Sequence, residues 1–296
     1  MAEKKYTPMM QHYLKMKEEN PDSILFYRLG DFYEMFFEDA KLVSQELDLV
    51  LTGRSAGVEE KVPMCGIPFH AANSYIQRLV KKGYKVAICE QLEDPSSAKG
   101  LVDRGIIKII TPGTYMDATM DAKSTNYMAS CDVSSFEITV IYCELSTGEL
   151  KYQTLQRSLV ALQKALLEQN VSELVCPMTM DKKWMAALEE MDTMLISKHK
   201  KANIDSEDLP LLNGIESESL KEAFALLMAY LKDTQKQRID HFLPIESMDK
   251  DKVLVMDYET KNHLELVSSQ SSNAKAESLW SFMDKCQSAM GSRMLK

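Results

Sequence analysis

The chain has 296 residues, 45% of them hydrophobic, and a formal net charge of −9. This length suffices for two domains, and this apolar fraction excludes a largely disordered chain. Because the first residues, MAEKKYTP, lack an apolar core and no run reaches the roughly 18 apolar residues of a membrane span, we expect no secretory signal, no membrane segment and a cytoplasmic location.

The negative charge is concentrated in the second part of the chain. Residues 1–115 contain 15 lysines and arginines against 16 acidic residues, a net charge of −1. Residues 116–296 contain 20 against 28, a net charge of −8. The first part can therefore present a local basic surface to nucleic acid, whereas the acidic second part suits contact with protein better than contact with phosphates.

Neither the cysteines nor any phosphate-binding loop indicates catalysis. The six cysteines are scattered without a C-x-x-C pair, and the five histidines are dispersed. This spacing predicts reduced thiols and no metal site. No G-x-x-x-x-G-K-[ST] loop occurs in the 296 residues, so we expect neither a bound cofactor nor catalytic residues in this chain.

Residues 1–115 predict a mixed α/β domain. Expected helices cover 6–19, 31–47 and 71–82, expected strands cover 23–29, 84–91 and 105–114, and a polar loop covers 52–62. The polar segment 116–125 is expected to be a linker.

Residues 126–250 predict a second α/β domain, with antiparallel strands first and alternating strands and helices afterwards. Expected strands cover 126–133, 134–145, 150–155, 172–177 and 193–199, and expected helices cover 157–169, 181–191 and 218–235. Residues 251–296 contain two helical starts, at 252–267 and 276–296, which we interpret as the beginning of a further, truncated helical region.

The segment 26–40, FYRLGDFYEMFFEDA, is the most unusual one, because six of its fifteen residues are aromatic. Asp31 and Glu34 fit a capping box, so we expect a turn at Gly30 and a helix from Asp31. On that helix Phe32 lies at the edge of the buried stripe and Glu34 on the opposite side. The pair is then either a core-edge aromatic with a helix cap, or an aromatic at a helix tip that enters something such as a base stack.

Several short motifs favour the second interpretation. They are T-P-M-M-Q-H-Y-L at 7–14, G-D-F-Y-E-M-F at 30–36, P-M-C-G-I-P-F-H at 63–70, A-I-C-E-Q at 87–91, D-P at 94–95, K-G at 99–100 and T-P-G-T at 111–114. In this order they resemble the mismatch-recognition domain of the MutS family of DNA mismatch repair proteins. The following residues resemble the family's connector domain, and G-S-R-M-L-K at 291–296 resembles the start of its core, or lever, region.

The resemblance implies specific roles. In the family the phenylalanine of F-x-E stacks on the mispaired base and the glutamate hydrogen-bonds it, so these roles fall to Phe32 and Glu34. It also implies a ribonuclease H-like connector that contacts a MutL-type repair protein. For the full-length protein it implies a homodimer, an ATPase that uses ATP and Mg²⁺ and lies beyond residue 296, and a location at the nucleoid of the bacterial cytosol.

The chemistry of a wedge agrees with these roles. An apolar wedge enters a duplex more cheaply where a mispaired base has already lost stacking and pairing energy. A carboxylate gains there only if it faces a donor on a base edge or carries a proton itself, and it disfavours entry into well-paired DNA. The candidates for additional DNA contacts are Leu29, Arg54, Lys61, Lys99, Arg104 and Lys108.

Two other functions stay open on the sequence. The chain could act mainly as a docking fragment for a partner protein through the acidic connector. A ribonuclease H-like domain could also be a metal-dependent nuclease, for which Asp132 with Glu137 or Glu144 offers the best set of carboxylates. Such nucleases gather three or four acidic residues around two metal ions, and no further set is evident.

Overall fold

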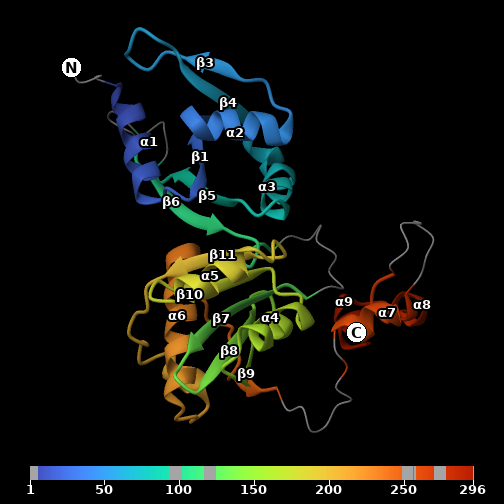
Figure 1. Ribbon diagram of the computed structural model, residues 1–296. Coiled ribbons are helices and arrows are strands. Elements are labelled where there is room, and N and C mark those ends of the chain that lie inside the picture. Colours follow the sequence, from blue (N-terminus) through green and yellow to red (C-terminus); the bar gives the residue numbers. More distant parts are fainter. Residues whose placement is uncertain are drawn as a thin grey trace. The chain divides into compact units, whose positions relative to one another are not determined.

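The computed structural model describes residues 6–93, 102–116, 125–248, 256, 258–269 and 278–295 (Figure 1). The chain divides into two compact units, one formed by Met1–Tyr115 with Leu231–Arg238 and the other by Met116–Tyr230 with Ile239–Lys296. Each unit contains a six-stranded sheet with helices, so the predicted fold class, two mixed α/β domains, is confirmed. Residues 117–124 of the expected linker lie outside the described residues.

Besides the last residues of a long helix from later in the chain, the described part of the first unit contains three helices, a short 3-10 helix and six strands. These are α1 (Pro8–Glu19), β1 (Ser23–Leu29), β2 (Phe32–Phe36), α2 (Phe37–Leu47), β3 (Thr52–Arg54), β4 (Val62–Pro68), η1 (Phe69–Ala71), α3 (Ala72–Lys81), β5 (Lys85–Gln91) and β6 (Arg104–Ile110). The sheet order is β3-β4-β2-β1-β5-β6. Only β1 and β5 run parallel; the other neighbours are antiparallel.

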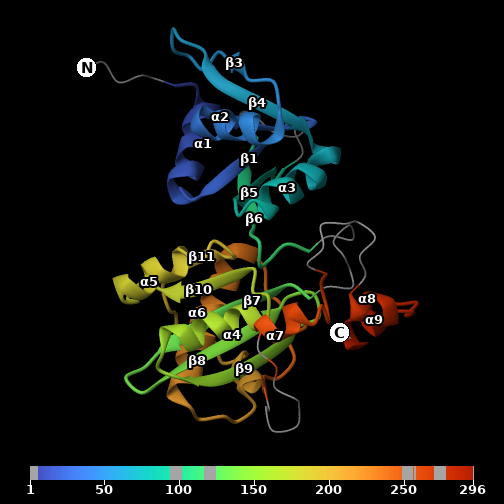
Figure 2. The same ribbon diagram turned by 45° about the vertical axis from the view of Figure 1, so that its right-hand side comes forward.

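The two faces of this sheet are covered by different helices (Figures 1 and 2). On one face α1 places the Tyr13 ring 4.9 Å from the ring centroid of Phe36 and 5.6 Å from that of Tyr27. On the other face lie α2 and α3, and the Cys65 thiol of β4 donates to the carbonyl oxygen of Ala40 in α2. Alternate residues of β2 therefore belong to different cores.

A buried carboxylate connects α1, β1 and α2. Asp39, 6% exposed, accepts hydrogen bonds from the backbone N–H of Leu25 at 2.9 Å and from the hydroxyl of Tyr13 at 3.3 Å. Its other oxygen accepts from the ammonium group of Lys17 at 2.9 Å. Burial and the neighbouring Asp39 charge raise the pKa of Tyr13, so this hydroxyl stays a hydrogen-bond donor.

The expected helix 31–47 is wrong in its first part. Residues Phe32–Phe36 form strand β2, and the helix begins only at Phe37. Asp31 is consequently a turn residue, and the capping box expected between Asp31 and Glu34 does not exist. The expected loop 52–62 is also corrected, because it contains β3, and β4 follows it.

The second unit begins with an antiparallel meander and continues with parallel strands, as expected. Its elements are β7 (Tyr127–Val133), β8 (Glu137–Glu144), β9 (Glu149–Gln156), α4 (Leu159–Glu168), β10 (Glu173–Pro177), α5 (Lys182–Glu189), β11 (Leu195–His199), η2 (Leu209–Leu212), α6 (Glu218–Gln235) and β12 (Glu246–Ser247). The sheet order is β11-β10-β7-β8-β9-β12, with β10 parallel to both β7 and β11.

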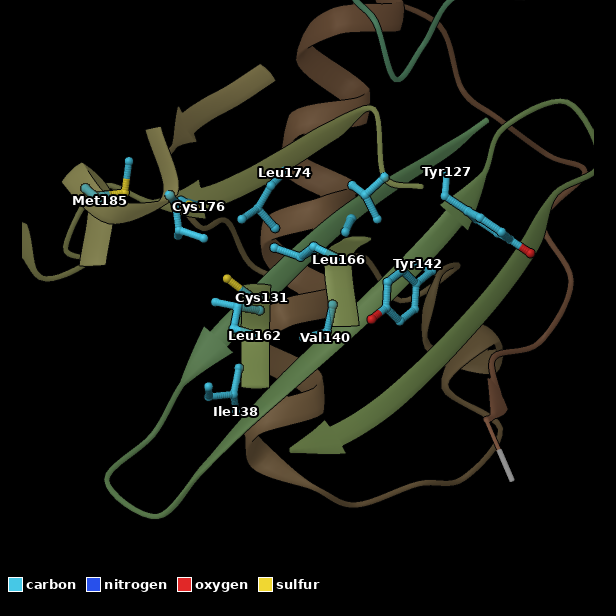
Figure 3. Packing of buried hydrophobic residues seen from close by; sticks show 13 residues of the cluster. Tyr127, Cys131, Ile138, Val140, Tyr142, Leu162, Leu166, Leu174, Cys176 and Met185 are labelled. Atoms are coloured by element: carbon cyan, nitrogen blue, oxygen red, sulfur yellow. The ribbon is translucent and has the colours of Figure 1, made fainter. Parts of the chain in front are cut away.

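A continuous apolar core lies between this sheet and helices α4 and α5 (Figure 3). Cys131 and Val140 from the sheet meet Leu162 and Leu166 from α4 there, and all four are fully buried. The part of α6 up to Tyr230 covers the opposite face, where the Ser130 hydroxyl donates to the carbonyl oxygen of Ala223 at 2.9 Å. The unit is thus a three-layer arrangement of helices, sheet and helix.

Three short helices follow in the last part of the chain. They are α7 (Tyr258–His263), α8 (Leu279–Met283) and α9 (Ala289–Leu295), and they lie within the two segments expected to begin helices. Among the described residues, no helix combines the length and the apolar character that crossing a bilayer would require.

The Asp39 network generates a stability prediction. Replacing Asp39 with Ala removes the acceptor of the buried Leu25 N–H and the partner of the Lys17 ammonium group, so we expect a loss of about 3 kcal/mol in the free energy of unfolding, measured by urea denaturation. Glu38→Ala is the matched control, because this neighbouring carboxylate is 84% exposed and pairs only with Lys41 in the same helix. Equal effects of the two substitutions would contradict a special role of the Asp39 network.

Candidate nucleic-acid interface

The candidate interface is built on the hairpin of β1 and β2. The strand register pairs Leu29 with Phe32, so Gly30 and Asp31 alone form the turn. Gly30 has a φ of +59°, which fits the type II′ hairpin turn with glycine at its first central position. This tight turn makes Phe32 the first residue of β2, at the very end of the strand.

Phe32 is the exposed aromatic residue of this strand. Its side chain is 47% exposed, whereas Tyr33, Met35 and Phe36 are 7% exposed or less. Because successive strand residues alternate between faces, Phe32 and Glu34 point to the same face of the sheet, and the paired Leu29 joins them. The helical interpretation placed Phe32 and Glu34 on opposite sides, so this geometry is a correction of it.

The Glu34 carboxylate is held by an arginine from another strand. Nη1 of Arg54 donates to Oε2 of Glu34, and the two side chains are 37% and 16% exposed. Arg54 lies on β3, and β4 separates that strand from β2. The residue of β4 that pairs with Glu34 is Gly66, so no side chain of β4 stands beside it. The guanidinium carbon of Arg54 also lies 6.0 Å from the ring centroid of Phe36.

A second aromatic residue at the hairpin turn was missed by the sequence analysis. Phe69 is 41% exposed, and its backbone N–H donates to the carbonyl oxygen of Asp31 at 2.9 Å. The guanidinium carbon of Arg28 lies over its ring, 3.7 Å from the centroid. Phe69 follows Pro68, the partner of Phe32, so it lies toward the opposite face. The available signal is its place in the motif P-M-C-G-I-P-F-H at 63–70.

Arg104 lies deeper than an exposed phosphate contact would. It is 7% exposed, and its guanidinium donates at 2.9 Å to the carbonyl oxygens of Arg28 and Val102. Its guanidinium carbon also lies 5.4 Å from the ring centroid of Tyr27. The contact with Arg28 joins β6 to β1, so part of the hydrogen-bonding capacity of Arg104 is already engaged within the unit.

The predicted lysine contacts are not gathered with Phe32. Lys61 is exposed and directly precedes β4. Lys108 pairs with Ile88, on the face opposite to Phe32, and burial lowers the pKa of its ammonium group. Lys99 lies outside the described residues. Of the predicted site, the structure thus brings together Leu29, Phe32, Glu34 and Arg54.

The carboxylates considered for a nuclease are not brought together. Asp132 accepts from the Lys201 ammonium group at 2.9 Å and from the Ser219 hydroxyl at 3.1 Å. Glu144 lies at the far end of β8, opposite Tyr127, and is buried against its own turn. In the part of the chain that the structure describes, no group of three or more histidine, cysteine or acidic side chains could hold a metal ion.

Comparison with known proteins identifies similar sequences. Residues 7–119 match the family MutS domain I. The chain is 43% identical to the DNA mismatch repair protein MutS of Bacillus licheniformis over 98% of its own length and 33% of that protein. It is 41% identical to the proteins of the same name from Clostridium tetani and Bacillus subtilis, over 99% and 98% of its length and 34% of theirs.

The chain is therefore similar to bacterial DNA mismatch repair proteins over almost its whole length. Residues 7–119, which match MutS domain I, contain the β1–β2 hairpin. The chain spans about a third of the length of the curated relatives that it matches.

Two phenylalanines of one strand give a test of this geometry. Phe36→Ala removes a 1% exposed ring from the core and should lower the free energy of unfolding by about 3–5 kcal/mol. Phe32→Ala removes a ring that is 47% exposed and should cost under about 1 kcal/mol. Urea denaturation of both variants measures the difference. A loss at Phe32 as large as that at Phe36 would mean that Phe32 is a core residue.

Proposed function

We propose that this chain detects mispaired or unpaired bases in duplex DNA, with Phe32 as the wedge that stacks on the base and Glu34 as its hydrogen-bonding partner. One observation carries the proposal: an exposed aromatic ring stands at the end of a central strand, and a carboxylate follows on the same face. The relatives whose names include DNA mismatch repair support the class of ligand.

The physical basis is the deformability of the duplex. Inserting an apolar wedge costs a few kcal/mol of stacking per base step, and less where pairing is already lost. The wedge must itself stay rigid, or the strain falls on the protein instead of the DNA. Phe32 meets this condition, because β2 is hydrogen-bonded to β1 on one side and to β4 on the other.

The second unit has a different role in this proposal. We infer that it connects the sensor to repair partners of the MutL type, and that ATP, Mg²⁺ and a homodimer belong to a longer protein. An alternative is that the chain acts mainly by docking a partner through this unit. Phe136, at the turn between β7 and β8, is 88% exposed, which favours such a surface.

Substitution of the wedge tests the sensor function. Phe32→Ala should abolish the preference of the chain for a duplex with a single T·G mispair or an unpaired T over the fully paired duplex. Fluorescence anisotropy measures both affinities. Low salt is used because the affinity of a protein for DNA falls as the salt concentration rises. Phe136→Ala is the control, since it removes an exposed ring from the other unit.

Three outcomes are informative. Loss of preference in Phe32→Ala alone supports the sensor. Equal preference in Phe32→Ala and wild type would refute the role of Phe32. Absence of any preference in the wild-type chain, together with capture of a MutL-type protein that Phe136→Ala disrupts, would favour the docking alternative.

A further inference from the structure

Without DNA, the carboxylate of the proposed reading pair is already bonded to Arg54. We propose that Arg54 is a positioning residue for mismatch recognition: it fixes the orientation of the Glu34 carboxylate and balances its charge, so that Glu34 discriminates between bases. This inference rests on the proposed function and assigns to Arg54 a different role from the phosphate contact expected from the sequence.

The position of Arg54 suits this role. Its strand β3 lies at the edge of the sheet, and its side chain crosses β4 to reach Glu34 on β2. Gly66, the residue of β4 that pairs with Glu34, has no side chain that could compete for this carboxylate. The contact thus joins two strands that are not neighbours in the sheet.

The bond occupies only one oxygen of the carboxylate. Nη1 of Arg54 donates to Oε2, and within the described ranges no group donates to Oε1. A carboxylate held at one oxygen has a fixed plane, and its second oxygen is ready to accept a hydrogen bond from a base edge. Without Arg54, this side chain would have to lose rotamer freedom when the base arrives.

The charge of Arg54 also changes what Glu34 contributes. A single carboxylate is repelled by the phosphates of any duplex, whereas a carboxylate paired with a guanidinium is nearly neutral at a distance. The remaining effect is local, because Oε1 gains a bond only where a base edge offers an unpaired donor. Arg54 should therefore increase the ratio of the affinities for mismatched and paired DNA more than it increases either affinity.

A double-mutant cycle separates this role from a phosphate contact. Arg54→Gln and Arg54→Lys are made in the wild-type chain and in the Glu34→Ala variant, and anisotropy gives the ratio of affinities for the mismatched and the paired duplex. Arg78→Gln is the matched control, because it removes an exposed arginine from α3 of the same unit. Circular dichroism checks that each variant is folded.

We expect Arg54→Gln to lower the mismatch ratio by about tenfold, the effect of one charge-assisted hydrogen bond. Arg54→Lys should restore the ratio only partly, because it keeps the positive charge but replaces a rigid planar guanidinium with an ammonium group on a flexible stem. Neither substitution should change the ratio in the Glu34→Ala chain, and Arg78→Gln should leave the ratio of the wild-type chain unchanged.

Two results would overturn the inference. In the first, Arg54→Gln lowers the affinity for both duplexes equally, in the wild-type and in the Glu34→Ala chain, and makes the salt dependence of binding shallower. This result would make Arg54 a phosphate contact. A mismatch ratio that Arg54→Gln leaves unchanged would show that Glu34 needs no positioning, while the proposed function would stand. Only equal affinities of the wild-type chain for the mismatched and the paired duplex would refute both the role of Arg54 and the proposed function.

Discussion

The register of the β1–β2 hairpin is the constraint on which the exposed site depends. A slip of one residue would move every side chain of β2 to the other face of the sheet. Phe32 would then exchange places with Tyr33 and Met35, which are buried on the α2 and α3 face. Burial of these two residues therefore fixes the exposure of Phe32, and the turn at Gly30 permits no other pairing of Leu29. The core on one face of the sheet determines what the other face presents.

Strand β2 contributes to both the core and the surface, because helix α1 covers only part of its length. Tyr13 of α1 packs on Phe36, at the end of β2 that leads into α2, whereas Phe32 lies at the turn end. The Asp39 network holds α1 against β1 and α2, so the edge of this cover is fixed. A rigid support is what a wedge requires, because a side chain on a loose backbone would yield before a base step does.

The sequence predicted most elements but not the local geometry of the site. The long helix α6, Glu218–Gln235, has the predicted bounds because its apolar periodicity is strong. The segment after Gly30 was wrongly predicted as a helix from its first residue. Strand β2 has apolar residues on both faces, so apolar and polar residues do not alternate along it, and the spacing of Asp31 and Glu34 imitates a capping box. The family resemblance had selected Phe32 and Glu34, but only the strand places them on one face, where the two can contact the same base.

Glu34 differs from two other carboxylates of the chain in the use of its oxygens. Asp39 and Asp132 each have both oxygens occupied, Asp39 by Lys17 and by a backbone N–H, Asp132 by a lysine and a serine. Both aspartates therefore connect separate elements of the fold. Glu34 is held at one oxygen only, beside an exposed ring. No count of acidic residues reveals this difference, because the partners lie far apart in the sequence and meet only across strands. The incomplete bonding of Glu34 is therefore a property of the tertiary structure, and it leaves one oxygen of this carboxylate without a donor among the described residues.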